Sequence, residues 1–219
     1  MASPAGVRDV FRGRILGVGS TSGTRIVVGV WDTSPFGAFA DAMVATSTGR
    51  RILVAPTEQV ASYVSATYSF DEVRIEDVVC RVAPNAVAVQ SNSLHLNVEV
   101  GGPTALGRLL RLIPAALSRS TTFATLCDPV ARVVLRGVRT RGTAGNGRTE
   151  FYAASDLRSV VSLSGWFGDG NLGDGNLGHV NLGHVNLGDL AEVWPEPGFG
   201  FSSTPRTPGL TTLTTTVVR

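Results

Sequence analysis

The chain has 219 residues, 43% of them apolar, and a formal net charge of +2. This length predicts one domain, the apolar fraction excludes an intrinsically disordered chain, and no apolar run approaches the ~18 residues of a membrane-spanning helix. All 19 basic residues are arginine. The absence of lysine excludes enzymes that form a lysine Schiff base, such as type I aldolases and lysine-dependent decarboxylases, and it excludes the P-loop.

The start of the chain and the cysteines favour a cytoplasmic protein. The first residues are polar and lack the hydrophobic segment of a secretory signal peptide. Cys80 and Cys127 are isolated, without the spacing of a redox or metal motif, and such cysteines are usually small buried side chains. The chain is therefore expected to reside in the cytoplasm.

The first hundred residues predict strands joined by tight turns, with one helix between them. Apolar and β-branched runs separated by turns rich in Gly and Ser predict strands at residues 11–18, 24–31, 39–46 and 51–55. Thr57 is an expected N-cap, and apolar residues at helical spacing predict a helix from residue 58 to about residue 68. Segments 72–82, 86–90 and 94–100 predict an antiparallel meander, and strict alternation in the last of them predicts one buried face.

A helical block is expected at about residues 104–136. The period of residues 104–112 is helical, and Pro114 is suited to the first turn of a second short helix. Asp128 followed by Pro129 is a strong start signal for a third helical segment.

The remaining elements complete the predicted fold. A strand is expected at residues 149–154 and another at 210–219, whereas residues 157–163 are ambiguous between helix and strand. The predicted fold class is α+β. It consists of an antiparallel sheet or partly closed β-barrel, with the helical block at about 104–136 covering one face or end.

A low-complexity repeat interrupts this pattern at residues 168–190. Its period is five, and its Asn-Leu-Gly units begin at Asn171, Asn176, Asn181 and Asn186. Residues 171–188 resemble the Asn-x-Gly-x-Gly-Asn-x-Gly arrays of mycobacterial PPE proteins and the pentapeptide-type solenoids. A solenoid needs several coils to bury a core, and this segment supplies about one. We therefore expect a duplicated surface loop, inserted in a single domain that spans residues 1–219.

Three further segments stand out in the sequence. They are Trp31-Asp-Thr-Ser-Pro-Phe-Gly-Ala-Phe-Ala-Asp41, Tyr68-Ser-Phe-Asp-Glu-Val73 and Phe199-Gly-Phe-Ser-Ser-Thr-Pro-Arg206. Together they resemble a family of actinobacterial proteins. The resemblance implies a bacterial origin, and it assigns no activity because none of these segments matches a motif with a known chemistry.

The charge is unevenly distributed along the chain. Residues 101–148 carry eight arginines and one acidic residue, a net charge of +7, while the blocks on either side are acidic. Such a block either faces an anionic ligand, RNA or a membrane surface, or pairs with the acidic blocks after folding. Nucleic acid is not favoured, because the chain has no aromatic residue for base stacking between Phe70 and Phe123.

The candidate binding residues surround the Gly- and Arg-rich segment 139–148. They are Arg139, Arg141, Arg148, Tyr152 and Asp156. Glycines allow backbone N–H groups to approach an anion, and the guanidinium fork binds phosphate or carboxylate in bidentate fashion. The leading hypothesis is therefore a module that binds a small anionic ligand.

Two other classes of function stay open. One is an enzyme that uses Asp, Tyr and Arg instead of Lys, Cys or His, and the other is a protein-interaction module that uses the repeat. Neither a cofactor nor a metal is expected, because His179 and His184 lie in a repeat that is poorly suited to holding metal-ligand geometry.

Overall fold

The computed structural model describes residues 8–113, 141–143, 147–168, 184–200 and 205–218. The strands are β1 (Arg8–Ser20), β2 (Arg25–Thr33), β3 (Phe39–Ala45), β4 (Arg51–Ala55), β5 (Glu72–Ile75), β6 (Val79–Ala83), β7 (Ala86–Gln90), β8 (Leu94–Pro103), β9 (Arg141–Thr143), β10 (Thr149–Gly168), β11 (His184–Asn186), β12 (Leu190–Ala191) and β13 (Gly209–Val218). The helices are α1 (Glu58–Ser65) and α2 (Ala105–Leu110). No helix in these ranges is long and apolar enough to cross a membrane.

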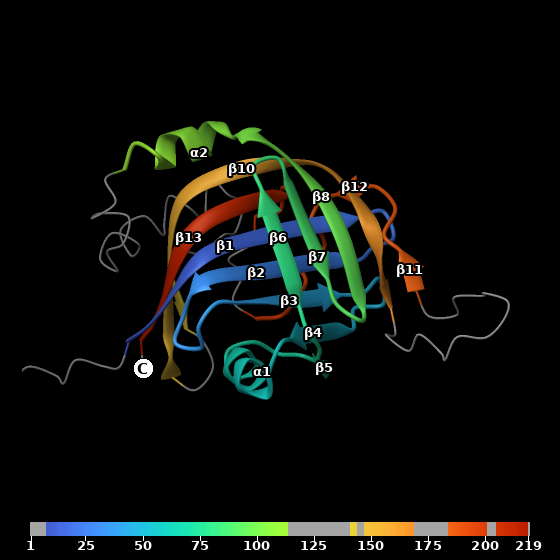
Figure 1. Cartoon of the computed structure of the whole chain (residues 1–219), viewed down its shortest axis with the longest axis horizontal. Helices are drawn as coiled ribbons and strands as arrows, with labels where there is room; N and C mark the ends of the chain where they lie inside the picture. The colour runs from blue at the N-terminus through green and yellow to red at the C-terminus, as the bar shows by residue number, and fades with distance from the viewer. Residues whose placement is uncertain (1–7, 114–140, 144–146, 169–183, 201–204, 219) are drawn as a thin grey trace, which may run out of the picture.

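All the described strands belong to one sheet, whose main path runs β5-β4-β3-β2-β1-β13-β10-β8-β7-β6. The strand pairs are antiparallel except β4 with β5, so the sheet is mixed. Figure 1 shows a strongly curled sheet with α1 and α2 at its periphery. The expected antiparallel sheet is thus largely confirmed, while the described part of the fold is mostly β rather than α+β.

Of the predicted helical block at about 104–136, the structure describes residues 104–113. The helix predicted for residues 104–112 forms there as α2, which is shorter and has six residues, and residues 114–136 lie outside the described ranges. Thr104 caps α2, since its Oγ1 accepts a hydrogen bond of 3.0 Å from the Gly107 N–H. A Cβ at Gly107 would lie 2.1 Å from the Leu157 carbonyl oxygen, so glycine lets the helix lie directly on β10.

The two edges of the main path, β5 and β6, are joined by residues 76–78 alone. The four Cα–Cα steps from Ile75, the end of β5, to Val79, the start of β6, span at most ~15 Å. Nine spacings of about 4.8 Å would separate the same two strands by roughly 43 Å in a flat sheet. The sheet must therefore curl until its edges nearly meet. The predicted single strand at 72–82 is wrong for this reason, because its two halves lie on opposite edges.

Side chains at the β5 edge contact the end of β10 and the residue before β8, across the gap in the curled sheet. The Arg74 guanidinium donates a hydrogen bond of 2.7 Å to the Gly168 carbonyl oxygen and lies 5.4 Å from the centre of the Phe167 ring. Glu76 Oε2 accepts hydrogen bonds of 2.9 Å from both the N–H and the hydroxyl of Ser93. The curl is thus closed by polar side chains instead of a ladder of backbone hydrogen bonds.

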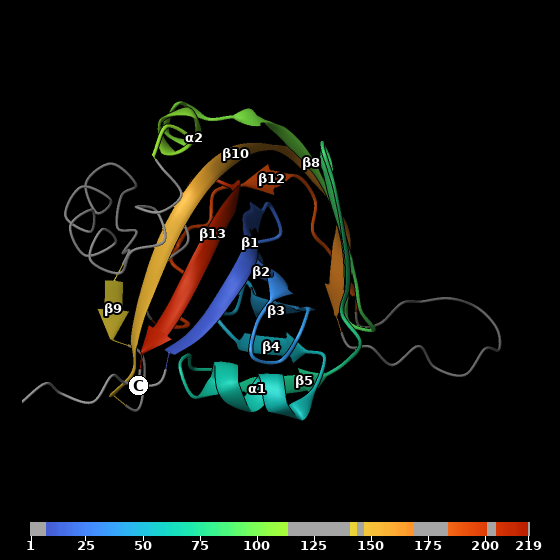
Figure 2. The same cartoon turned by 60° about the vertical axis from the view of Figure 1, so that its left-hand side comes forward.

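The inner face of the curled sheet holds the main hydrophobic core. Figure 2 shows β6–β8 facing β1–β4, with β10 arching between them. The expected alternation in 94–100 is confirmed, because Leu94, Leu96, Val98 and Val100 are buried in this core. Even-numbered residues of β2, such as Ile26 and Val28, enter the same core from the opposite half. Burial of such side chains contributes about 1.5–3 kcal/mol each.

The other face of β3 and β4 is covered by α1. Thr57 caps this helix as predicted, since its Oγ1 accepts a hydrogen bond from the Val60 N–H. Val60 and Ala61 then pack against Leu53 and Ala55 of β4 in a second apolar cluster. Because Leu53 alternates with residues of the main core, β4 is buried on both faces.

The end of the repeat is part of the sheet. β11 pairs with β10, and Leu187, which follows it, is fully buried in the main core. The expectation of a surface loop is therefore wrong for residues 184–190. The other part of the repeat, residues 169–183, lies outside the described ranges.

Leu187→Ala is predicted to lower the free energy of unfolding by about 2–5 kcal/mol, because it leaves a cavity in the main core. Val185→Ala, two residues earlier at a side chain that is 50% exposed, is the matched control and should cost less than about 1 kcal/mol. Urea unfolding of the two variants measures the difference. Equal losses would show that Leu187 does not anchor the repeat.

Candidate functional site

A pocket of about 70 Å³ lies on the face of the sheet opposite the main core. Successive residues of a strand point to opposite faces. Val27, Gly29 and Trp31 of β2 therefore form its floor, while Ile26 and Val28 enter the core. α1 and the residues after it cover this floor, and β1, β10 and β13 complete the walls.

A hydrogen bond between Trp31 and Asp41 crosses the floor. Trp31 Nε1 donates to Asp41 Oδ1 over 3.2 Å, from β2 to β3. The two side chains meet above Gly29, which is paired with Asp41 in the ladder. A Cβ at Gly29 would lie 2.5 Å from Asp41 Oδ1 and 2.7 Å from Trp31 Nε1. Only glycine leaves room for this contact.

Asp41 is a buried carboxyl, with 5% of its surface exposed. Removal from water disfavours the charged form, so burial raises the pKa of Asp41 from 3.8 to about 7, and the Trp31 hydrogen bond opposes this rise. At neutral pH the two protonation states are therefore similarly populated. This is the condition under which a side chain both accepts and returns a proton readily.

A second polar cluster, the tyrosine–glutamate cluster, consists of Tyr68, Glu150 and Tyr152. Glu150 Oε2 lies 3.0 Å from the Tyr68 hydroxyl and 2.7 Å from the Tyr152 hydroxyl, and the two hydroxyls also contact each other. Glu150 and Tyr152 project side by side from β10, and Tyr68 follows α1. Three oxygens thus form a triangle in the pocket wall.

Both tyrosine hydroxyls donate to Glu150 Oε2, so the carboxyl group is the acceptor of this cluster. Burial raises the pKa of Glu150, whereas the hydrogen bonds from Tyr152 and Tyr68 and the charge of Arg148 lower it. Burial and the neighbouring Glu150 also raise the pKa of Tyr68 and of Tyr152 well above the usual value, so both tyrosines stay neutral.

Arg148 lies beside this cluster. Its guanidinium carbon is 4.8 Å from the centre of the Tyr63 ring, an arrangement that permits a cation–π interaction. The Tyr63 hydroxyl donates a hydrogen bond of 2.9 Å to Asp9 Oδ2. Arg148 Nη1 is buried and has no hydrogen-bond partner among the described residues. A positive charge therefore borders the pocket without belonging to its lining.

Two hydroxyls of the pocket wall also lack a partner. Thr67 Oγ1 and Thr215 Oγ1 are buried and make no hydrogen bond within the described part of the chain. Thr215 is 5% exposed. Burying a hydroxyl without a partner costs about 1–3 kcal/mol, so these two hydroxyls would gain from a polar partner.

The structure brings only part of the predicted binding site together. Tyr152 lines the pocket and Arg148 lies near it. Arg141 belongs to β9 and is paired with Phe151, so its backbone lies next to the β10 residues of the pocket. Arg139 is outside the described residues.

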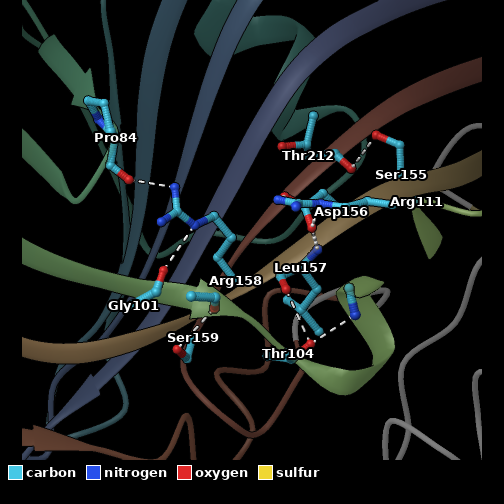
Figure 3. A network of polar contacts seen from close by, with 12 residues as sticks. Pro84, Gly101, Thr104, Arg111, Ser155, Asp156, Leu157, Arg158, Ser159 and Thr212 are labelled. Carbon is cyan, nitrogen blue, oxygen red and sulfur yellow. Dashed lines mark hydrogen bonds and ion pairs between the residues drawn. The ribbon is translucent and has the colours of Figure 1, made fainter. Parts of the chain in front are cut away.

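Asp156 lies elsewhere, in the network of polar contacts that Figure 3 shows. Its two carboxylate oxygens accept hydrogen bonds of 3.0 and 2.8 Å from Arg111, which follows α2. A β-bulge in β10 between Ala154 and Asp156 separates this contact from the pocket. The Asp156–Arg111 pair thus attaches α2 to the sheet, and Asp156 is not one of the pocket residues.

Sequence reasoning missed Asp41, Glu150 and Tyr68. One signal was available for Asp41, which is the single charged residue within an otherwise apolar strand, β3. Glu150 and Tyr68 carried no such signal. They are 82 residues apart and meet only because β10 and the segment after α1 adjoin in the folded chain.

No family model and no curated protein matches the sequence of this chain. Among solved structures, acetoacetate decarboxylase from Legionella pneumophila aligns with a TM-score of 0.42 and 8% identity, over 98% of this chain and 86% of that one. An acetoacetate decarboxylase-like enzyme from Sphingomonas wittichii aligns with a TM-score of 0.36 and 8% identity, over 99% and 92%. Likenesses this low assign no activity to the present chain.

Asp41→Asn is predicted to remove a pH dependence of stability. The folded state binds the Asp41 proton more tightly than the unfolded state, so the wild type loses stability as pH rises from about 4 through about 7. Between about pH 5 and about pH 8 we expect Asp41 to account for a loss of about 2–3 kcal/mol. Urea unfolding at both pH values measures it.

Asp32→Asn is the control for this experiment. Asp32 lies next to Trp31, but its side chain is 62% exposed and pairs with Arg14 over 3.5 Å. It should keep the wild-type pH dependence. If Asp41→Asn keeps it as well, burial does not hold Asp41 partly protonated.

Proposed function

We propose that the pocket binds one small, uncharged molecule that carries a hydroxyl or carbonyl group. The observation that carries the proposal is Thr215, whose hydroxyl is buried in the pocket wall without a partner among the described residues. A polar atom of a ligand would complete it. Thr67 Oγ1 offers a second position of the same kind.

The size of the pocket limits the ligand. A cavity needs about 10–15 Å³ to hold one water molecule. The pocket, at about 70 Å³, therefore suits a ligand of roughly six non-hydrogen atoms. Phe11, Val27 and Met43 supply apolar contacts, which favours a compact hydrocarbon body with one polar group.

The charge of the pocket favours a neutral ligand. Two carboxyls, Asp41 and Glu150, line it, and Glu150 accepts hydrogen bonds from Tyr68 and Tyr152. Above about pH 7, Asp41 contributes a negative charge in a region of low dielectric. An anion would meet this charge directly, whereas an alcohol or ketone would not.

A series of ring compounds tests the proposal. Cyclopentanone, cyclopentanol, cyclopentylamine and cyclopentanecarboxylate share one ring and differ in the polar group. We expect saturable binding of the ketone and the alcohol with Kd values near about 1 mM. Cyclopentanecarboxylate should bind at least about tenfold more weakly at a pH of about 8, because Asp41 is then charged. Ligand-observed NMR titrations measure all four compounds.

Two threonine variants place the binding in the pocket. Thr215→Val keeps the shape and removes the hydroxyl, so it should weaken cyclopentanol binding about three- to tenfold. Thr214→Val is the matched control, since its side chain lies on the opposite face of β13. Equal affinities of the two variants, or no saturable binding by the wild type, would contradict the proposal.

An anionic ligand is the second candidate, and Arg148 favours it. Its buried Nη1 has no hydrogen-bond partner among the described residues, and a guanidinium binds carboxylate strongly. In that case cyclopentanecarboxylate would bind better than cyclopentanol, and Arg148→Ala would abolish the difference. The same titrations therefore separate the two candidates.

A further inference from the structure

The pocket presents two different polar groups to a single bound molecule. Asp41 lies on the floor, where Trp31 holds Oδ1. The tyrosine–glutamate cluster lies in the wall. Asp41, Tyr68, Glu150 and Tyr152 all line this one pocket. A ligand in a pocket of about 70 Å³ would contact both.

We propose that the pocket catalyses proton transfer at the carbon atom next to a carbonyl group, with Asp41 as the base and the tyrosine–glutamate cluster as the hydrogen-bond donor to the carbonyl oxygen. The proposal rests on the proposed function, because the substrate is one of its neutral carbonyl ligands. It adds a reaction to what would otherwise be a binding pocket.

The reaction needs no group beyond those in the pocket. The Asp41 carboxylate takes a proton from the carbon next to the carbonyl group. The C–H electron pair forms the C=C bond, and the carbonyl π electrons move to oxygen to give an enolate. Asp41 then returns the proton to the far end of a conjugated enolate, which gives isomerisation, or to the same carbon. Exchange at that carbon results when the proton on the Asp41 carboxyl is replaced by one from water before it is returned. Atoms and charge balance in both cases.

The cluster is suited to stabilising the enolate oxygen. The Tyr68 and Tyr152 hydroxyls each hold one hydrogen, and both donate it to Glu150 Oε2. When one tyrosine turns its O–H toward the substrate, the cluster loses one internal hydrogen bond. It gains a bond to an oxygen that acquires charge, and charge-assisted bonds are roughly twice as strong. The gain is therefore largest when the enolate forms.

Asp41 is suited to the role of base. Its Oδ1 accepts the Trp31 hydrogen bond, which leaves Oδ2 for the substrate. Burial raises the pKa of Asp41 to about 7, which makes it a stronger base than an exposed carboxylate and leaves it charged at slightly alkaline pH. The other ionisable groups around the pocket are Tyr63, Tyr68, Glu150 and Tyr152, with Asp9 and Arg148 behind Tyr63.

Hydrogen–deuterium exchange of cyclopentanone in D₂O tests the reaction. Loss of the signal from the protons next to the carbonyl group is followed by NMR at a pD of about 8.5, above the pKa of Asp41. We expect the wild type to accelerate exchange over buffer, with a rate that saturates as the ketone concentration rises. Asp41→Asn should lose this acceleration by at least about a hundredfold, the lower range for a general base.

Two variants complete the test. Asp32→Asn, the exposed carboxyl next to Trp31, should keep the wild-type rate. Tyr152→Phe removes one donor from the cluster and should slow exchange at least about tenfold at saturating ketone. A rate that Asp41→Asn leaves unchanged would overturn the assignment of the base, and an unchanged rate in Tyr152→Phe would overturn that of the donor.

The binding titrations distinguish failure of the catalytic proposal from failure of the proposed binding function. Saturable binding of cyclopentanone by the wild type without accelerated exchange would overturn the catalytic proposal and leave the proposed function intact. Absence of saturable binding would overturn both. Circular dichroism melting of Asp41→Asn and Tyr152→Phe shows whether each variant is folded, and loss of exchange in a folded variant supports the proposal.

Discussion

The three residues between β5 and β6 constrain the whole molecule. They join strands at opposite edges of the sheet, so the sheet has to curl back on itself. Curling turns one face inward, where apolar side chains from both halves fill the space. It leaves the other face of β2 and β3 free to be covered by α1. The pocket lies beneath α1, on the face of the sheet opposite the main core.

The pocket contains two buried carboxyls that differ in their partners. Glu150 accepts hydrogen bonds from Tyr68 and Tyr152. Among the described residues the donor to Asp41 is Trp31, which stabilises its charged form but does not offset burial. Burial thus leaves Asp41 as a group that titrates near neutral pH. A carboxyl with such a pKa is suited to general acid–base chemistry.

Short-range sequence patterns predicted individual turns, caps and strands correctly, but they did not predict how distant segments of the chain meet. The Thr57 cap, the hairpins and the alternation in β8 follow from neighbouring residues, and each is confirmed. The division of 72–82 between two edges was not predictable, because both halves have strand composition. The helical propensity of residues 104–112 was only partly realised, as α2 ends at Leu110.

The candidate site was predicted in part for the same reason. Composition indicated an arginine-rich segment, and two of its neighbours, Arg148 and Tyr152, do lie at the pocket. The pocket itself is assembled from β2, β3, β10 and the end of α1, and no sequence window contains these together. Gly29 is an example. Its sequence position indicates only a glycine within a strand, and the need for glycine follows from the contact of Trp31 with Asp41 above it in the folded chain.

The pairing of β1 with β13 has a consequence for biosynthesis. Arg8 lies opposite Val218, so the ladder that joins the two halves of the sheet closes only after the ribosome has passed the last of these residues. Until then the side of β1 that faces away from β2 lacks its β13 partner. Contacts between residues so far apart in the sequence form slowly. The nascent chain therefore carries an open strand edge during synthesis, and such an edge can pair with other chains and aggregate.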